Sequence, residues 1–380
     1  MRDIWSARGE RLLAAGRFAA AGAAFAQALK RSPGNASLWL RAADCAFLSG
    51  KPRAAAQAAA KARALAGGPD LLRRELQARL IAGDDTGAGK VLASRDLPAG
   101  EAAFWRGVLA CRAARWVEAR RCFLAAVSSD PERLAVRAGL FAAWAGHRAA
   151  GVKAAPKARG LVIAGLGWKR PRQATVGAFD ALFSCRSLFV VANTVDDDMR
   201  DVLSLFRATV AAVVFRGTEA EADRAAKSAL AAAARGRAGT VTRGNPLAYG
   251  RFAARLVAAA WAKGIPVEVL PGVSAFEGLA AQVRPAPGEP LGLQLRGAFT
   301  ADDSDPARAL SAFTPTAAAG RLRLAKALPR LAAGRTLWWL ASEGPAAAEP
   351  ARIAAARLAA DLRAGPAPGI LHATPRRRAR

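Results

Sequence analysis

The chain has few of the side chains that most often perform acid–base chemistry near neutral pH. Its 380 residues include two histidines and one tyrosine. Neither His147 nor His372 has a serine or cysteine partner at a spacing that indicates a nucleophile and its base. We therefore expect both histidines to be structural.

Cysteines and carboxylates in metal-binding patterns are also scarce. The four cysteines show no C-x-x-C spacing, so neither a zinc site nor a disulfide framework is indicated. The acidic run Asp196–Asp198 is interpreted as a helix cap, because carboxylates stabilise a helix start, and no metal is expected. The N-terminus lacks the apolar segment of a signal peptide, and no apolar run reaches the roughly 18 residues of a spanning helix. These absences predict a cytoplasmic protein without membrane association.

Acidic residues are too few to balance the basic ones. There are 29 Asp and Glu against 57 Lys and Arg, which gives a formal net charge of +28. Clustered basic residues would indicate nucleic-acid binding, but here they are scattered, and only residues 376–380 form a tight cluster. We interpret the charge as a solubilising field that also attracts anionic ligands, and a nucleic-acid partner is not expected.

The N-terminal region contains a helical repeat. An Ala-Phe-Pro pattern recurs with the same spacing as Ala21, Phe25, Pro33 and as Ala119, Phe123, Pro131. Trp5 is followed by Trp39 after one period of 34 residues. The pattern resembles tetratricopeptide repeats, in which Ala lets two antiparallel helices approach, Phe fills the space between them and Pro ends the second. Residues 1–150 are therefore predicted to form a helical solenoid, with a degenerate third repeat near 70–97 and a last helix near 134–147.

Strands and helices alternate after a Gly/Pro/Lys-rich join at residues 151–160. Strands are expected at 161–164, 188–192, 210–215, 240–242 and 267–270, with helices near 174–186, 197–206, 218–235, 249–263 and 275–282. This alternation predicts a parallel sheet covered on both faces, with a ligand site at the carboxyl ends of its strands. After a loop-rich stretch at 284–290, strands are expected at 292–295, 309–313, 336–340 and 370–372, with helices near 320–332 and 349–363.

Three expected strands end in glycine turns. The first reads Gly-Leu-Gly at 165–167 with Thr175 downstream, the second Gly-Asn-Pro-Leu-Ala-Tyr-Gly at 244–250, and the third Pro-Gly-Val-Ser-Ala at 271–275. Glycine allows the backbone N–H groups of such turns to approach a ligand closely. We expect the three turns to meet at one edge of the sheet.

In this order the three motifs resemble the S-adenosylmethionine-dependent tetrapyrrole methylase superfamily, with Asn245 where the superfamily usually has Asp. The resemblance implies a two-lobed α/β domain over residues 158–375, with lobes of about 158–283 and 291–375 and the cofactor between them. It implies that S-adenosylmethionine contacts Gly165, Leu166, Gly167, Thr175, Gly244, Asn245, Pro246, Leu247, Tyr249, Gly272, Val273, Ser274 and Ala275.

One branch of the superfamily resembles this chain in further segments. Residues 274–282, followed by Gly292–Gln294 and the C-terminal 369–375, resemble the borosin peptide backbone N-methyltransferases. Those enzymes carry a Tyr- and Arg-rich helix after the third strand, which is thought to help deprotonate the amide. Here that segment has no tyrosine, so Tyr249 and Arg243 remain as candidate catalytic residues.

The sequence thus predicts a helical-repeat solenoid followed by a methylase-like α/β domain. Its expected activity is methyl transfer to a peptide or protein held partly by the repeats, since concave solenoids bind extended chains. A corrin or other small-molecule methylase remains open, as does a degenerate methylase domain that serves as a scaffold, or methylation of ribosomal RNA. The oligomeric state, a homodimer included, also stays open.

Overall fold

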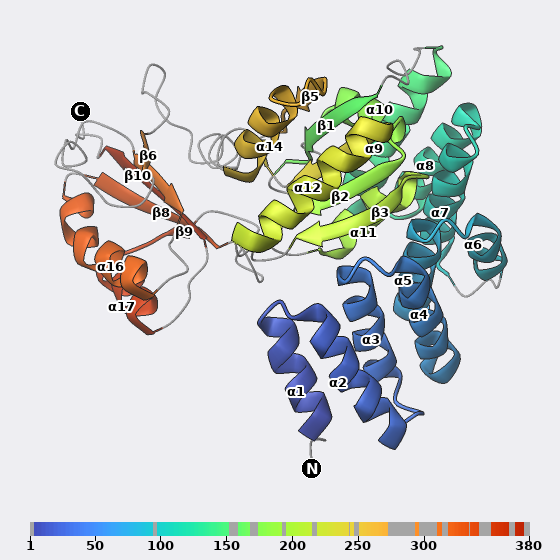
Figure 1. Ribbon diagram of the computed structural model, residues 1–380, viewed down its shortest axis with the longest axis horizontal. Coiled ribbons are helices and arrows are strands. Elements are labelled where there is room, and N and C mark those ends of the chain that lie inside the picture. Colours follow the sequence, from blue (N-terminus) through green and yellow to red (C-terminus); the bar gives the residue numbers. More distant parts are fainter. Residues whose placement is uncertain are drawn as a thin grey trace. The chain divides into compact units, whose positions relative to one another are not determined.

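The computed structural model places two compact units, residues 1–272 and 273–380. It describes residues 4–93, 97–151, 159–167, 174–191, 195–214, 219–242, 244–246, 251–272, 293–295, 310–313, 318–333, 335–341, 351–364 and 369–375. The first unit holds helices followed by a parallel sheet (Figure 1). The predicted class, a helical-repeat region followed by an α/β domain, is confirmed.

The repeats form antiparallel helix pairs. Their helices are α1 Ile4–Ala14, α2 Phe18–Arg31, α3 Ala36–Leu48, α4 Pro52–Ala66, α5 Pro69–Ile81, α6 Asp85–Leu92, α7 Ala99–Arg112, α8 Trp116–Ser129 and α9 Pro131–Ala149. The turns before α2 and α4 contain Gly16 and Gly50 at φ +73° and +70°, a backbone region that favours glycine. The region expected to be a degenerate repeat forms α5 and a shorter second helix, α6, of 8 residues.

The repeated phenylalanines fill the space inside their helix pairs, as predicted. Phe25 and Phe123 are each fully buried. A Cβ added to Gly9 would lie 2.7 Å from the Phe25 ring, and one added to Gly107 would lie 2.7 Å from the Phe123 ring. The repeat therefore also includes a glycine on the first helix, which lets the ring of the second helix lie against its backbone.

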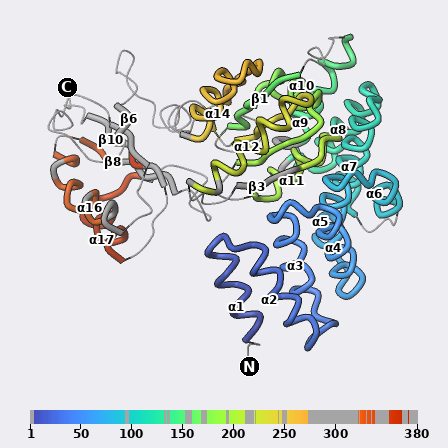
Figure 2. The backbone as a smooth tube through the Cα atoms, viewed as in Figure 1, coloured from blue at the N-terminus to red at the C-terminus, as the bar shows by residue number. Residues whose placement is uncertain are grey.

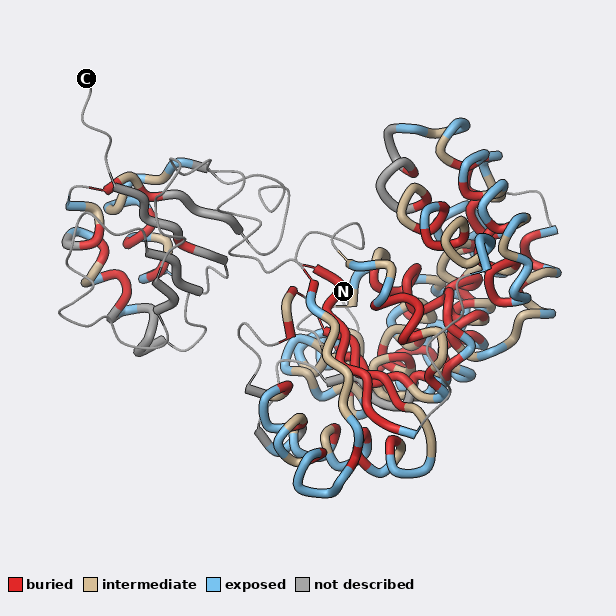
Figure 3. The backbone as a smooth tube through the Cα atoms, turned by 90° about the horizontal axis from the view of Figure 1, so that it is seen from above, coloured by how far each residue is buried: buried red, intermediate tan, exposed pale blue. Residues whose placement is uncertain are grey.

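The sheet of the first unit has the strand order β3-β2-β4-β1-β5, and every pair is parallel. The strands are β1 Gly160–Gly165, β2 Ser187–Val191, β3 Thr209–Val214, β4 Arg237–Thr242 and β5 Val267–Leu270, with helices α10 Val176–Phe183, α11 Asp197–Leu205, α12 Glu219–Arg235 and α14 Arg251–Trp261. All six residues of β1 are buried, as expected for a central parallel strand covered on both faces. Figure 3 shows buried backbone running through the interior of the first unit. The side chain of Asp196 caps α11 by accepting a hydrogen bond from the N–H of Met199, which confirms the interpretation as a cap.

The two faces of this sheet pack against different partners. Residues such as Leu161 and Ile163 face α12 and α14, whereas Val162 and Ala164 belong to a core that continues through α10 and α11 into the repeats. In that core the Phe179 ring of α10 lies 5.8 Å from Phe141 of α9. The repeats and the sheet thus share one hydrophobic core within the first unit. Figure 2 traces the backbone of both regions.

The second unit contains a mixed sheet with the order β6-β7-β10-β8-β9. Its elements are β6 Leu293–Leu295, β7 Leu310–Phe313, α16 Ala318–Ala332, β8 Arg335–Ala341, β9 Ala351–Arg352, α17 Ala355–Ala364 and β10 Gly369–Pro375. Leu324 and Leu328 of α16 pack with Leu358 and Leu362 of α17 in its core. The prediction that the last helix starts near 349 was wrong: residues 351–352 pair with β8 instead, and α17 begins at residue 355.

Candidate functional site

The three glycine motifs lie at the carboxyl ends of adjacent strands. Strand β1 stands between β4 and β5, so the loops that leave these strands meet at one edge of the sheet. This edge is where parallel α/β sheets place their ligands. The predicted convergence of the three turns is confirmed for Gly165, Gly244 and Gly272.

The loops approach so closely that only glycine fits at two positions. A Cβ on Gly165 would lie 2.1 Å from the carbonyl oxygen of Gly244 and 2.7 Å from the amide nitrogen of Gly272. A Cβ on Gly272 would lie 2.5 Å from the amide nitrogen of Gly167. These contacts are with backbone atoms, which cannot swing aside as a flexible side chain can. The absence of a side chain at both glycines is therefore required for the loops to come together.

Two hydrogen bonds connect the first two loops. The N–H of Gly244 donates to the carbonyl of Gly167 at 3.0 Å, and the N–H of Leu166 donates to the carbonyl of Thr242 at 2.9 Å. Gly167 and Gly244 have φ of +79° and +67°, so both use the left-handed region. A Cβ on Gly244 would meet no heavy atom within 4 Å, so its glycine is required by conformation rather than by crowding.

The structure describes some of the other residues predicted to contact the cofactor. Pro246 is buried and Asn245 is partly exposed, both directly after Gly244. The Thr175 hydroxyl oxygen accepts a hydrogen bond from the N–H of Ala178 at 3.2 Å, so this residue caps α10. Six predicted site residues lie outside the described residues: Arg243, Leu247, Tyr249, Val273, Ser274 and Ala275.

Thr242 is a residue of this edge that the motif analysis missed. It is the last residue of β4 and is 8% exposed, and its hydroxyl lies 3.5 Å from the carbonyl of Ala164 on β1. It holds the ends of the two strands that carry the first two loops. A threonine at the last position of a buried strand, directly before the second motif, was the available sequence signal.

Helix α10, which follows the first glycine loop, is fixed in place by side chains of the last repeat helix, α9. The indole N–H of Trp144 donates to Asp180 Oδ1 at 2.8 Å, and His147 Nε2 lies 3.2 Å from Asp180 Oδ2. Arg148 is 3.8 Å from the same carboxylate and its guanidinium lies over the Trp116 ring. His147 thus has a carboxylate partner that its position in the sequence did not indicate.

Helix α11 is anchored to the repeats by a second polar network. Arg200 donates to Asp44 at 2.7 Å and lies over the Phe47 ring, while Gln77 donates to Asp201 at 2.9 Å. Burial lowers the pKa of the Arg200 guanidinium, and the neighbouring Asp44 acts in the opposite direction. Because a buried charge is costly without a partner, this ion pair fixes how α11 lies on the repeats.

A third anchor lies at the end of α11. The Arg112 side chain is 2% exposed and pairs with Asp85 at 2.7 Å. It also donates hydrogen bonds to the carbonyl oxygens of Ser204 and Phe206. The arginine thereby satisfies carbonyl groups at a helix end that has no intrahelical donors left.

A parallel α/β layer with glycine loops at its carboxyl edge defines a domain that binds a small cofactor. Residues 160–342 match the family described as tetrapyrrole (corrin/porphyrin) methylases, and residues 12–80 match the tetratricopeptide repeat. The chain thus contains a domain of the tetrapyrrole methylase family, preceded by tetratricopeptide repeats. Its α/β fold is that of the S-adenosylmethionine-binding methylases of this family.

Solved structures are similar to part of the chain. A uroporphyrin III C-methyl transferase from Thermus thermophilus is 19% identical, with 56% of this chain and 96% of that chain covered and a TM-score of 0.43. The cobalt precorrin-4 methyltransferase CbiF is 15% identical, with 56% and 94% covered and a TM-score of 0.39. A comparison with curated protein sequences finds no match.

The described residues contain no group of three or more His, Cys, Asp or Glu side chains arranged to hold a metal ion. Within the same part of the chain, no helix combines the length and the apolar character needed to cross a bilayer.

Proposed function

We propose that this protein transfers the methyl group of S-adenosylmethionine to a peptide or protein that is held in part by the repeats. The observation that carries the proposal is the meeting of three glycine loops at the ends of β1, β4 and β5, in a domain of the tetrapyrrole methylase family. The repeats support a macromolecular substrate, because helical solenoids present long surfaces to extended chains.

The residues at the sheet edge fit such a cofactor. Gly165 and Gly272 bring the loop backbones together without side chains between them, and the space in the Cβ direction of Gly244 is open. Backbone N–H groups at this edge, with Asn245, would hold the polar parts of the cofactor. S-adenosylmethionine supplies an electrophilic methyl group on a positively charged sulfur, so the protein's main task is to orient the two reactants.

The acceptor side of the reaction is assigned to Arg243 and Tyr249. Tyr249 is the one phenol of the chain, and it would orient the acceptor or accept its proton. An amine needs little such help, whereas an amide N–H is a very weak acid. A chain with a single phenol and no Tyr-rich helix after β3 therefore favours an acceptor that is already nucleophilic.

Methylation of a tetrapyrrole carbon is the second candidate. It is favoured by the description of the matched family as corrin and porphyrin methylases. A tetrapyrrole would not need the repeats, so the two candidates differ in their dependence on residues 4–93 and 97–149.

The test is to incubate the full-length protein with isotope-labelled S-adenosylmethionine and, separately, with products of its neighbouring genes and with a corrin precursor. Mass spectrometry then locates the labelled methyl group. We expect label on a peptide or protein, and a modest loss of rate in Tyr249→Phe. Label on the tetrapyrrole alone would support the second candidate. Tight cofactor binding without any transfer would instead favour a scaffold, and absence of cofactor binding by calorimetry would refute the proposal.

A further inference from the structure

One face of the repeats is occupied by the chain itself. The hydrogen bonds and ion pairs that fix α10 and α11 come from α3, α5, α7 and α9, which are the first helices of their pairs and the final helix. A partner that used this face over α5, α7 and α9 would have to displace the sheet and its shared core. A partner of the repeats would therefore bind to another face.

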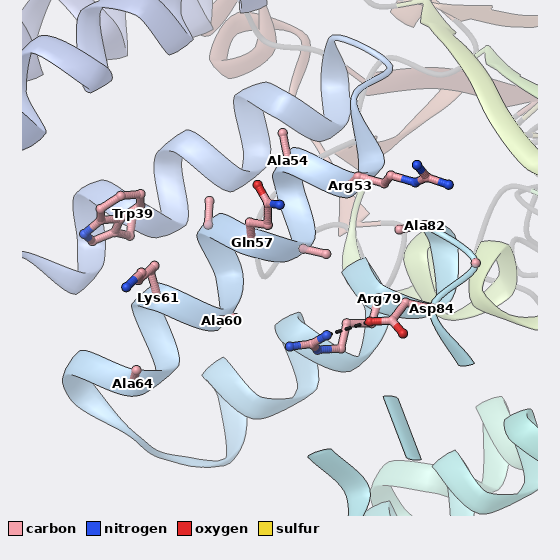
Figure 4. Close-up of a pocket in the computed structure, with 13 residues that line it drawn as sticks. Trp39, Arg53, Ala54, Gln57, Ala60, Lys61, Ala64, Arg79, Ala82 and Asp84 are labelled. Atoms are coloured by element: carbon pink, nitrogen blue, oxygen red, sulfur yellow. Dashed lines mark hydrogen bonds and ion pairs between the residues drawn. The ribbon is translucent and has the colours of Figure 1, made fainter. Parts of the chain in front are cut away.

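A groove of about 1000 Å³ lies along α4. We call it the α4 groove; its polar and aromatic lining residues are Trp39, Arg53, Gln57, Lys61, Arg79 and Asp84. Figure 4 shows Trp39 and Lys61 at one end, Arg53 at the other, and the pair of Arg79 and Asp84 along one side. Alanines of α4 form much of the rest of the lining, so the backbone of a ligand can come close to the helix.

The groove has an excess of positive charge. The one carboxylate of its lining, Asp84, pairs with Arg79 at 2.6 Å. Burial by itself would raise the pKa of Asp84, but the hydrogen bond from the N–H of Gly87 and the ion pair with Arg79 outweigh it and lower that pKa. Arg53 and Lys61 are both exposed, and neither forms an ion pair with any described residue. An adjoining hollow of about 450 Å³ shares Arg79 and Asp84 and adds Arg63, which pairs with Glu75, and Lys90. The unpaired charges on this surface are thus cations.

The three polar side chains of α4 in the groove form a ladder. Arg53, Gln57 and Lys61 follow each other at intervals of four residues, which places them along one face of the helix. With a rise of 1.5 Å per residue, Arg53 and Lys61 are about 12 Å apart along the axis. An extended chain covers about 13 Å in four residues, and its side chains i and i+4 point to the same side. Two carboxylates four residues apart in an extended segment therefore match the two cations.

The lining favours a peptide over a nucleic acid. Single-stranded nucleic acids are bound by aromatic side chains on which successive bases stack. The groove has one such ring, Trp39, and the indole N–H of that residue already donates to the carbonyl of Pro33 at 2.8 Å. The alanines of α4 leave room for a peptide backbone, and the Gln57 amide between Arg53 and Lys61 suits a peptide with acidic side chains.

We propose that the α4 groove binds an extended acidic peptide segment, with two carboxylates four residues apart facing Arg53 and Lys61. The inference rests on the proposed function only for the idea that this segment belongs to the methyl acceptor. Binding itself requires neither cofactor nor turnover.

The test is equilibrium binding to the full-length protein without cofactor, at low and at physiological salt. The probe is a fluorescently labelled, unstructured peptide with two glutamates separated by three residues. Comparison peptides carry the two glutamates side by side, or two lysines in their place. We expect the first peptide to bind best and its affinity to fall with salt, because the contacts are exposed ion pairs. The variant R53E/K61E should weaken its binding at least about tenfold and strengthen binding of the lysine peptide.

The matched control is K30E/K227E, which changes the net charge equally at exposed lysines on α2 and α12. It should leave the affinity within about twofold, as expected for screened, distant charges. The inference is overturned if both variants weaken the peptide equally, or if peptide spacing has no effect. It is also overturned if a single-stranded RNA binds more tightly than the peptide and depends on Arg53 and Lys61. Failure of methyl transfer leaves these binding measurements unaffected, so the two proposals fail separately.

Discussion

Substituting Gly272 by alanine tests the central geometry of the cofactor site. The added Cβ would lie 2.5 Å from the amide nitrogen of Gly167, whereas ordinary contact begins at 3.4 Å, so the loops after β1 and β5 must separate by about 1 Å. Inserting one methyl group into such a packed contact costs about 1–3 kcal/mol. If the cofactor requires the loops in contact, its affinity should fall by about 5- to 150-fold.

The assay is isothermal titration calorimetry with S-adenosylmethionine, with circular dichroism to show that the variant is folded. Two variants separate the causes. Gly244→Ala adds no crowding but forces alanine to φ +67°, which costs about 1–2 kcal/mol, so a smaller loss of affinity is expected. Gly177→Ala, in α10, meets no heavy atom within 4 Å and should stabilise the helix by about 0.5–1 kcal/mol without changing affinity.

The expected order of affinity is therefore Gly177→Ala equal to wild type, then Gly244→Ala, then Gly272→Ala. Unchanged binding in a folded Gly272→Ala protein would refute the argument that loop contact creates the site. An equal loss in Gly177→Ala would mean that the effect is not local to the glycine loops.

Three further predictions concern stability. Phe25→Ala and Phe123→Ala should each lower the free energy of unfolding by about 3–5 kcal/mol in urea titrations, because both rings fill closed spaces between paired helices; a loss below about 1 kcal/mol would contradict this. Arg112→Met should cost about 3–5 kcal/mol, because it removes the donor of the Ser204 and Phe206 carbonyls at the end of α11 and of the Asp85 carboxylate. Hydrogen exchange should show α11 opening first; unchanged protection of α11 would refute the anchoring role. Burial raises the pKa of the Cys45 and Cys185 thiols from an ordinary 9.0 to about 12, so the unfolded chain loses these protons at lower pH than the folded one. The free energy of unfolding should therefore fall as the pH rises from about 9 to 12. If a double alanine variant shows the same dependence of this free energy on pH, other groups are responsible.

The order of elements could be read from the sequence because it depends on local periodicity. Runs such as Leu161–Ala164 are apolar throughout, as a strand buried on both faces must be, and Ala21 with Phe25 repeats at the spacing of a packed helix pair. The glycine motifs were recognisable for the same reason. A turn with positive φ, such as that at Gly167, can be occupied at low cost by almost no other residue.

What the sequence could not supply was the contact between distant segments. No local pattern places Trp144 against Asp180, or Arg200 against Asp44, because such pairs form only when the repeats fold onto the sheet. The sequence marked residues 151–160 as a join between two parts. The tertiary structure decided that these parts share a core, since burying the aromatic face of α9 against α10 removes apolar surface from water on both sides.

The same distinction applies to the site and to the groove. The sequence by itself determined that three strands end in glycine turns, because the glycines that such turns require can be read directly from the chain. That Gly165 lies against both Gly244 and Gly272 was decided by the strand order β4-β1-β5, which brings loops from distant parts of the sequence to one edge. Likewise the charges of Arg53 and Lys61 are in the sequence, but only the folded structure shows that neither forms an ion pair with a described residue, because pairing depends on how the helices pack.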